Sequence, residues 1–111
     1  MLHVLTPPSP FLGNRRPSSY LELEARAERD VGRRMAGTMT KVRKAGIKNA
    51  VSKLVTGAPP EQIIRYAHRW RGDVIVMGTH GRCGIGRAFV GSVAERVLQS
   101  ARGPVLTVRG R

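Results

Sequence analysis

The part of this chain with the clearest chemical potential is a glycine-rich stretch that follows an apolar run. Residues 78–92 contain five glycines and three basic or imidazole side chains, at His80, Arg82 and Arg87. Glycine lets a backbone approach a ligand closely, and cationic side chains attract an anion. The stretch therefore predicts a loop that binds phosphate.

This loop leads into a predicted helix N-terminus. Ser92 is a favourable N-cap residue, and Glu95 stands three positions later, where its carboxylate can bond back to the amide of the cap. Unpaired amides and the positive end of the helix dipole make such a terminus an anion site. Ser92 and Glu95 thus predict a helix whose start faces the loop.

The glycine spacing resembles that of a known family. Gly78, Gly81 and the Gly91-Ser92 pair match the pattern G-x-x-G-x9-G-[S/T] of the nucleotide-binding branch of the universal stress proteins. The words Val-Met-Gly-Thr-His-Gly-Arg, Gly-Ser-Val-Ala-Glu-Arg-Val and Pro-Val-Leu-Thr-Val-Arg are similar to the same family. The resemblance is dense over the last third of the chain and looser upstream.

The residues themselves indicate a phosphate-binding loop, and only the resemblance implies ATP, with or without Mg²⁺. In the family the first two glycines contact the triphosphate, and the Gly-Ser pair contacts phosphate and ribose. The implied function is a stress-response regulator that hydrolyses ATP slowly at most, with no residue assigned as catalyst. The expected nucleotide-binding residues are Met77, Gly78, Gly81, Arg82, Gly91, Ser92 and Val93.

Other chemistry finds less support in the sequence. No Gly-Lys pair precedes Ser or Thr, so the phosphate loop of the large NTPase class is absent, and Phe89 replaces the third glycine of a dinucleotide fingerprint. His80 and Cys83 offer two metal ligands without a second pair, so no metal site is expected. The loop has no carboxylate pair for acid–base catalysis, which argues against a dedicated hydrolase.

The charge of the chain leaves two further function classes open. Twenty Lys and Arg against seven Asp and Glu give a formal net charge of +13, a field that attracts nucleic acid. Dispersed basic residues, few aromatic side chains and no recognition motif weigh against a basic nucleic-acid-binding module, whose binding would be non-specific. The loop can also be a plain connection, or a nucleotide-site geometry that no longer binds. The chain would then be a partner-interaction protein.

Hydrophobic periodicity predicts an α/β fold in which strands and helices alternate in the order βαβαβαβ. The expected strands are Leu2–Leu5, 47–55, 73–77 and Val105–Val108, the third being covered on both faces. The expected helices start at Ser19, Pro59 and Ser92 and end near Gly46, Trp70 and Ala101. This order predicts one domain, 1–111, with a parallel sheet. The resemblance implies a small Rossmann-like sandwich of the adenine nucleotide alpha hydrolase-like type.

In the resembling family a strand and a helix precede the point at which this sequence starts, so the expected fold is N-terminally truncated. The family's first strand lies at the centre of the sheet, between the strands that correspond to Leu2–Leu5 and 73–77. Without it, either these two strands pair directly or another copy supplies the missing edge, because unpaired buried backbone is unfavourable.

The closing strand, Val105–Val108, is the expected dimer edge. In the family the equivalent edge pairs antiparallel with its copy across a two-fold axis, and an uncovered apolar edge otherwise promotes aggregation.

A single cysteine allows no internal disulfide, and no stretch approaches the roughly 20 apolar residues of a membrane span. With no secretory signal visible, these features predict a cytoplasmic protein without membrane contact, and the resemblance implies a homodimer.

Overall fold

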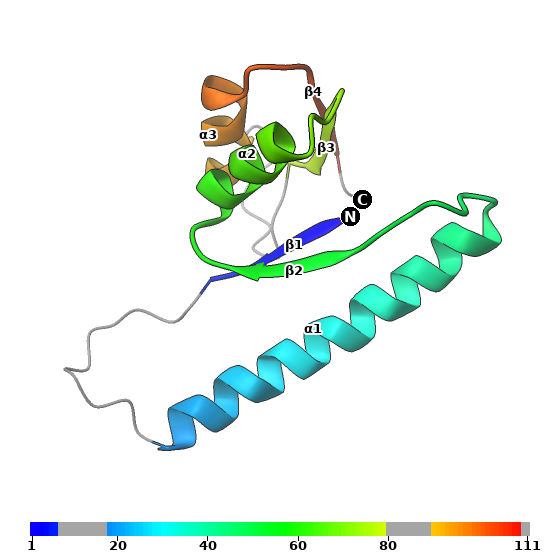
Figure 1. Ribbon diagram of the computed structural model, residues 1–111. Coiled ribbons are helices and arrows are strands. Elements are labelled where there is room, and N and C mark those ends of the chain that lie inside the picture. Colours follow the sequence, from blue (N-terminus) through cyan, green and yellow to red (C-terminus); the bar gives the residue numbers. More distant parts are fainter. Residues whose placement is uncertain (7–17, 80–89, 110–111) are drawn as a thin grey trace. The chain divides into compact units, whose positions relative to one another are not determined.

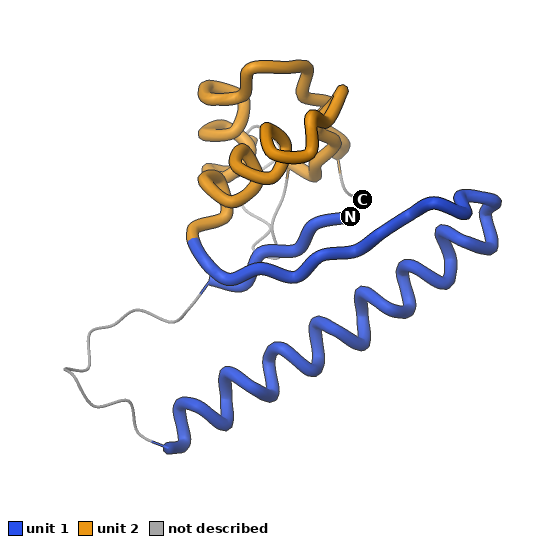
Figure 2. The backbone as a smooth tube through the Cα atoms, viewed as in Figure 1, with its two compact units in different colours: residues 1–57 blue, residues 58–111 orange. Residues whose placement is uncertain are grey.

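The computed structural model describes residues 1–6, 18–79 and 90–109. The chain forms two compact units, residues 1–57 and residues 58–111 (Figure 2). Both units are built from strands and helices that alternate along the chain, and both strand pairs are parallel. The α/β fold class with parallel strands is therefore confirmed.

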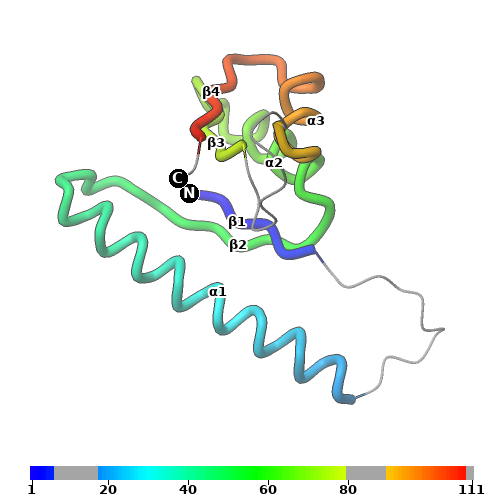
Figure 3. The backbone as a smooth tube through the Cα atoms, turned by 180° about the vertical axis from the view of Figure 1, so that it is seen from behind, coloured from blue at the N-terminus to red at the C-terminus, as the bar shows by residue number. Residues whose placement is uncertain are grey.

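The first unit consists of two short strands joined by a long helix. Strand β1 (Leu2–Leu5) pairs in parallel with β2 (Lys53–Thr56), Leu2 lying opposite Lys53 and Leu5 opposite Thr56. Helix α1 (Ser18–Lys44) runs alongside this pair (Figures 1 and 3). The most deeply buried side chains of α1 are Met35 and Met39, in its C-terminal half.

The end of α1 follows the sequence prediction closely. Gly46 adopts a φ of 95°, and its amide donates to the carbonyl oxygen of Arg43 at 3.0 Å, while Ile47 donates to Val42 at 3.3 Å. These two bonds define a Schellman motif, which satisfies carbonyl groups that the last turn would leave unpaired. Glycine is needed here because side chains disfavour a positive φ.

The second unit begins with helix α2 (Pro59–Arg69). Strand β3 (Ile75–Gly78), helix α3 (Ser92–Ser100) and strand β4 (Val105–Val108) complete it. Strands β3 and β4 pair in parallel, and α3 packs against both α2 and β4 (Figure 1). Ala94 and Val97 of α3 are almost completely buried and form the centre of this unit.

The predicted bounds of two strands were wrong in part. Of the strand expected over 47–55, only the last three residues belong to β2, which continues to Thr56, because β1 has only four residues with which β2 can pair. The strand expected over 73–77 runs instead from Ile75, whose amide donates to the carbonyl oxygen of Pro104 at 3.0 Å, to Gly78. In both cases the length of the partner strand sets the bounds.

Strand β3 is also not covered on both faces. Ile75 and Met77 are half-buried, whereas the side chain of Val76 is 59% exposed. Val76 lies opposite Leu106, which is 56% exposed, so the β3–β4 pair has one covered and one uncovered face. Successive side chains of a strand point to opposite faces, so helices that pack on one face cover every second residue and leave the others exposed.

β1 and β3 belong to separate two-stranded sheets, one in each unit. The expectation that Leu2–Leu5 either pairs directly with the strand near 73–77 or receives an edge from another copy stays a prediction. The expectation of a single domain over 1–111 also stays a prediction.

Candidate functional site

The described ends of the glycine-rich stretch meet at one end of the second unit. Met77 and Gly78 are the last two residues of β3, and the amide of Gly91 donates to the carbonyl oxygen of Thr79 at 2.8 Å. Since α3 begins at Ser92, this bond brings the carboxyl end of a parallel strand beside a helix N-terminus. In open α/β sheets, ligands bind at the carboxyl ends of the strands.

The cap of α3 differs from the sequence prediction by one residue. The carbonyl oxygen of Gly91 accepts the first helical hydrogen bond, from the amide of Glu95 at 3.0 Å, so Gly91 is the N-cap. Ser92 is therefore the first helical residue, and Glu95 stands one position too late for a capping box. Gly91 has no side chain, and α3 lacks a side-chain cap hydrogen bond. An anion is a suitable acceptor for the first amides of a helix without a side-chain cap.

Gly91 is required by the chain's own backbone. A Cβ atom placed on Gly91 would lie 2.8 Å from the carbonyl oxygen of Thr79, closer than a Cβ atom approaches an atom to which it is not bonded. The carbonyl oxygen of Thr79 is thus the backbone atom that a side chain at this position would meet.

The remaining predicted site residues divide into two groups. Ser92 and Gly78 are exposed, and Met77 and Val93 are half-buried, so five of the predicted residues lie at or next to the two ends that the Thr79–Gly91 bond joins. Gly81 and Arg82 lie outside the described residues, as do His80, Cys83 and Arg87. Their expected roles stay predictions.

The described charged groups near this end form one ion pair. Arg96 of α3 donates to Glu61 of α2 at 3.0 Å, and both side chains are more than half exposed. Water and salt screen such a pair, which contributes less than about 1 kcal/mol. Among residues 1–6, 18–79 and 90–109, no group of three His, Cys, Asp or Glu side chains is placed to hold a metal ion.

Sequence reasoning missed a second feature of this unit. A pocket lined by Arg65, His68, Arg71 and Arg102 opens at the amino end of β3. The spacing of Arg65 and His68, three residues apart on α2, is a signal that they share a helix face. Arg71 and Arg102 lie far apart in the sequence, so only the fold reveals that they converge.

The comparisons with known proteins agree with the fold. The model of the universal stress protein family matches residues 1–109. Universal stress protein MJ0531 of Methanocaldococcus jannaschii is 34% identical over 91% of this chain and 59% of its own length. A universal stress protein of Thermus aquaticus, from the QAH/OAS sulfhydrylase 3′ region, is 34% identical over 98% of this chain and 75% of its own length. The chain thus spans between about three fifths and three quarters of these two relatives.

Solved structures show the same architecture. The structure of MJ0577, reported as a structure-based assignment of biochemical function, superposes with a TM-score of 0.86 at 26% identity. The match covers 99% of this chain and 73% of that one. A second structure, PH0823, has a TM-score of 0.72 at 21% identity and supports the fold alone. In the described part of the chain, no helix is long and apolar enough to cross a bilayer. The family model, the two relatives and the shared fold together show that this chain belongs to the universal stress protein family.

Proposed function

We propose that this chain is an ATP-binding stress-response regulator, with the nucleotide held between the carboxyl end of β3 and the N-terminus of α3. The observation that carries the proposal is the 2.8 Å hydrogen bond from Gly91 to Thr79, which closes the glycine-rich stretch at these two ends. Family membership supports it, and so does the match of Gly78, Gly81, Gly91 and Ser92 to the nucleotide-binding pattern.

The described residues fit a phosphate group at this place. The first amides of α3 have no side-chain acceptor from the cap, and the hydroxyl of Ser92 is exposed beside them. A helix N-terminus with free amides favours an anion through its hydrogen-bond donors and its dipole. Met77 and Val93, both half-buried, supply apolar surface next to the same end. Gly81 and Arg82 complete the proposed set.

The proposal is tested by titrating ATP against the wild type, Ser92→Ala and Ser100→Ala. Both variants remove one hydroxyl from an exposed position of α3, at its first and last residues. We expect Ser92→Ala to weaken ATP binding about ten- to a hundredfold, the effect of losing one hydrogen bond to a charged group, and Ser100→Ala to leave it unchanged. Equal affinity in all three proteins would refute the site.

A parallel titration with a DNA duplex at two salt concentrations separates the alternatives. The net charge of +13 is the observation that favours nucleic acid. Binding through bulk charge would fall steeply with salt and be unaffected by Ser92→Ala. If neither ATP nor DNA binds, the chain is a partner-interaction protein without this ligand.

We also propose that two copies associate through β4. Among the described residues, β4 pairs with β3 on one side only, and Leu106 and Val108 leave apolar surface uncovered. An apolar strand with a free edge can pair with another chain, and a two-fold axis satisfies both copies at once.

A further inference from the structure

A pocket at the amino end of β3 combines an apolar floor with a basic rim. It has a volume of about 740 Å³ and lies between α2, the start of β3 and the segment that joins α3 to β4. Volumes of about 300 to 1,000 Å³ are typical of small-molecule sites. All the residues that line it belong to the second unit.

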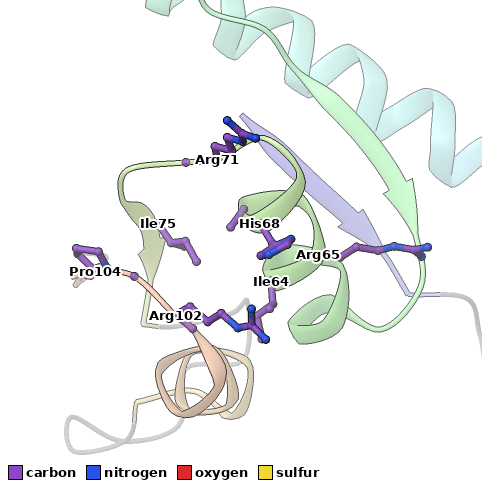
Figure 4. A pocket seen from close by; sticks show the side chains of 11 residues that line it. Ile64, Arg65, His68, Arg71, Ile75, Arg102 and Pro104 are labelled. Carbon is purple, nitrogen blue, oxygen red and sulfur yellow. The ribbon is translucent and has the colours of Figure 1, made fainter.

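The polar side chains of this pocket carry one sign of charge. Arg65, Arg71 and Arg102 line it together with His68, and no acidic residue is among the lining residues. In the described part of the chain, none of these three guanidinium groups has an ion-pair partner, whereas Arg33 and Arg96 pair with Asp30 and Glu61. Figure 4 shows the side chain of Arg102 reaching toward Ile64, whereas the side chain of Arg65 extends away from Ile75 and Pro104. The unpaired guanidinium group of Arg102, with Arg71 at the margin, attracts an anion, and its planar fork suits carboxylate, sulfonate or phosphate oxygens.

The floor of the pocket is apolar. Figure 4 shows the side chains of Ile64 and Ile75 directed into the space between α2 and β3, with Arg71 at its margin and Pro104 on the strand side. Ile64 and Ile75 are only partly buried, so a ligand can cover surface that the protein itself leaves accessible. An inorganic anion would not use this floor, which favours a ligand with an apolar body.

The backbone at Arg71 is unusual. The φ of Arg71 is 49°, and the amide of Gly72 donates to the carbonyl oxygen of Ala67 at 3.0 Å, which closes α2 as a Schellman motif. Glycine normally occupies this left-handed position. Here the sequence places an arginine one residue before the available glycine, and this arginine lines the pocket. A side chain retained in a disfavoured conformation is consistent with a binding role.

This pocket is separate from the proposed nucleotide site. Ile75, which lines it, is the first residue of β3, whereas Gly78 is the last. Three residue steps along a strand span about 10 Å, so the two sites lie at opposite ends of β3.

We infer that the pocket binds a small organic anion whose apolar body rests on Ile64 and Ile75 and whose anionic group contacts Arg102 or Arg71. The probe that matches this chemistry is 1-anilinonaphthalene-8-sulfonate, which joins an aromatic body to one sulfonate. Its uncharged counterpart is N-phenyl-1-naphthylamine, which keeps the aromatic body and lacks the sulfonate.

The experiment titrates both probes by fluorescence against the wild type, Arg71→Gln, Arg102→Gln and Arg69→Gln. Arg69 lies on α2, two residues before Arg71, and is exposed, but it does not line the pocket, so Arg69→Gln removes the same charge as a control. We expect one saturable site for the sulfonate, about fivefold or more weaker in Arg71→Gln and Arg102→Gln, and within twofold of the wild type in Arg69→Gln. All three arginines are exposed, and circular dichroism of each variant checks that the fold is kept.

Three further readouts make the result decisive. The ring protons of His68 should shift in nuclear magnetic resonance spectra as the sulfonate saturates the pocket. Val76→Ser, which changes an exposed apolar side chain outside the pocket, should leave the affinity for the sulfonate unchanged. Excess ATP should not displace the sulfonate. Equal binding of the uncharged probe would show a general apolar patch, and an equal loss in Arg69→Gln would show diffuse charge. Displacement by a DNA duplex would indicate a nucleic-acid surface. Each of these three outcomes overturns the proposal. Failure of ATP binding at the other site would leave it intact.

Discussion

The amide nitrogen of Gly91 and the carbonyl oxygen of Thr79 lie 2.8 Å apart, and a Cβ atom on Gly91 would meet that same oxygen at 2.8 Å. The hydrogen bond can therefore form at this distance only because Gly91 has no side chain. Valine at this position would disturb the loop itself as well as any ligand, so Ser92→Ala is the better test of nucleotide binding.

Gly91→Ala should lower the free energy of unfolding by about 1–3 kcal/mol, because the methyl group forces the Thr79 carbonyl away. Urea denaturation followed by circular dichroism measures this change. Gly103→Ala is the matched control, since a Cβ atom on Gly103 meets nothing within 4 Å. Equal stability of Gly91→Ala and the wild type would contradict the close approach of these two segments.

Ser92→Ala should change the free energy of unfolding by less than about 0.5 kcal/mol. Ser92 is exposed, and Gly91 rather than Ser92 is the N-cap of α3. Loss of a capping serine would instead cost about 1 kcal/mol. Thermal and urea denaturation distinguish the two values, and a loss of 1 kcal/mol or more would mean that the hydroxyl of Ser92 caps the helix.

Ala58→Ser should stabilise the chain by about 0.5–1 kcal/mol. Ala58 is the N-cap of α2, has extended backbone angles and has no side-chain cap hydrogen bond. A serine there can accept from the amide of Glu61, the third residue of a helix that begins with two prolines. The comparison is with Ala36→Ser, in the middle of α1, which should be neutral or destabilising because serine is a weaker helix former than alanine.

Gly32→Ala and Gly37→Ala should each stabilise α1 by about 0.5–1 kcal/mol. Both glycines lie inside the helix, and a Cβ atom on either meets nothing within 4 Å. Gly46→Ala should instead destabilise the end of α1, because the φ of Gly46 is 95°, a value that alanine disfavours. A stabilising Gly46→Ala in equilibrium unfolding would show that the helix ends differently.

Leu106→Lys should weaken self-association, because it places a charge on the uncovered face of β4. Leu23→Lys is the control: Leu23, on α1, is 65% exposed and far from β4 in the sequence. Sedimentation velocity across a concentration series should show a dimer for the wild type and Leu23→Lys, and a monomer for Leu106→Lys. A wild type that is monomeric throughout would remove β4 as an interface.

Features that depend on near neighbours in the chain could be predicted from the sequence. Leu2–Leu5 and Val105–Val108 have the expected bounds because Pro7 and Pro104 flank them and withhold backbone donors. Gly46 ends α1 as expected, since only local backbone conformation decides that stop. The glycine spacing that identifies the family is likewise a property of consecutive residues.

Features that depend on distant partners could not be predicted. The bounds of β2 and β3 follow the lengths of β1 and β4, which are separate in the sequence and meet only through backbone hydrogen bonds. The N-cap of α3 is Gly91 and not the predicted Ser92, because the Gly91 amide donates a hydrogen bond to the carbonyl oxygen of Thr79, twelve positions earlier. The pocket with Arg65, Arg71 and Arg102 exists because packing brings the end of α2 beside the segment before β4. The sequence by itself thus determined the family, the order of elements and the local stops. Tertiary structure decided which groups face one another, because contacts between distant residues depend on chain closure and packing rather than on local conformation.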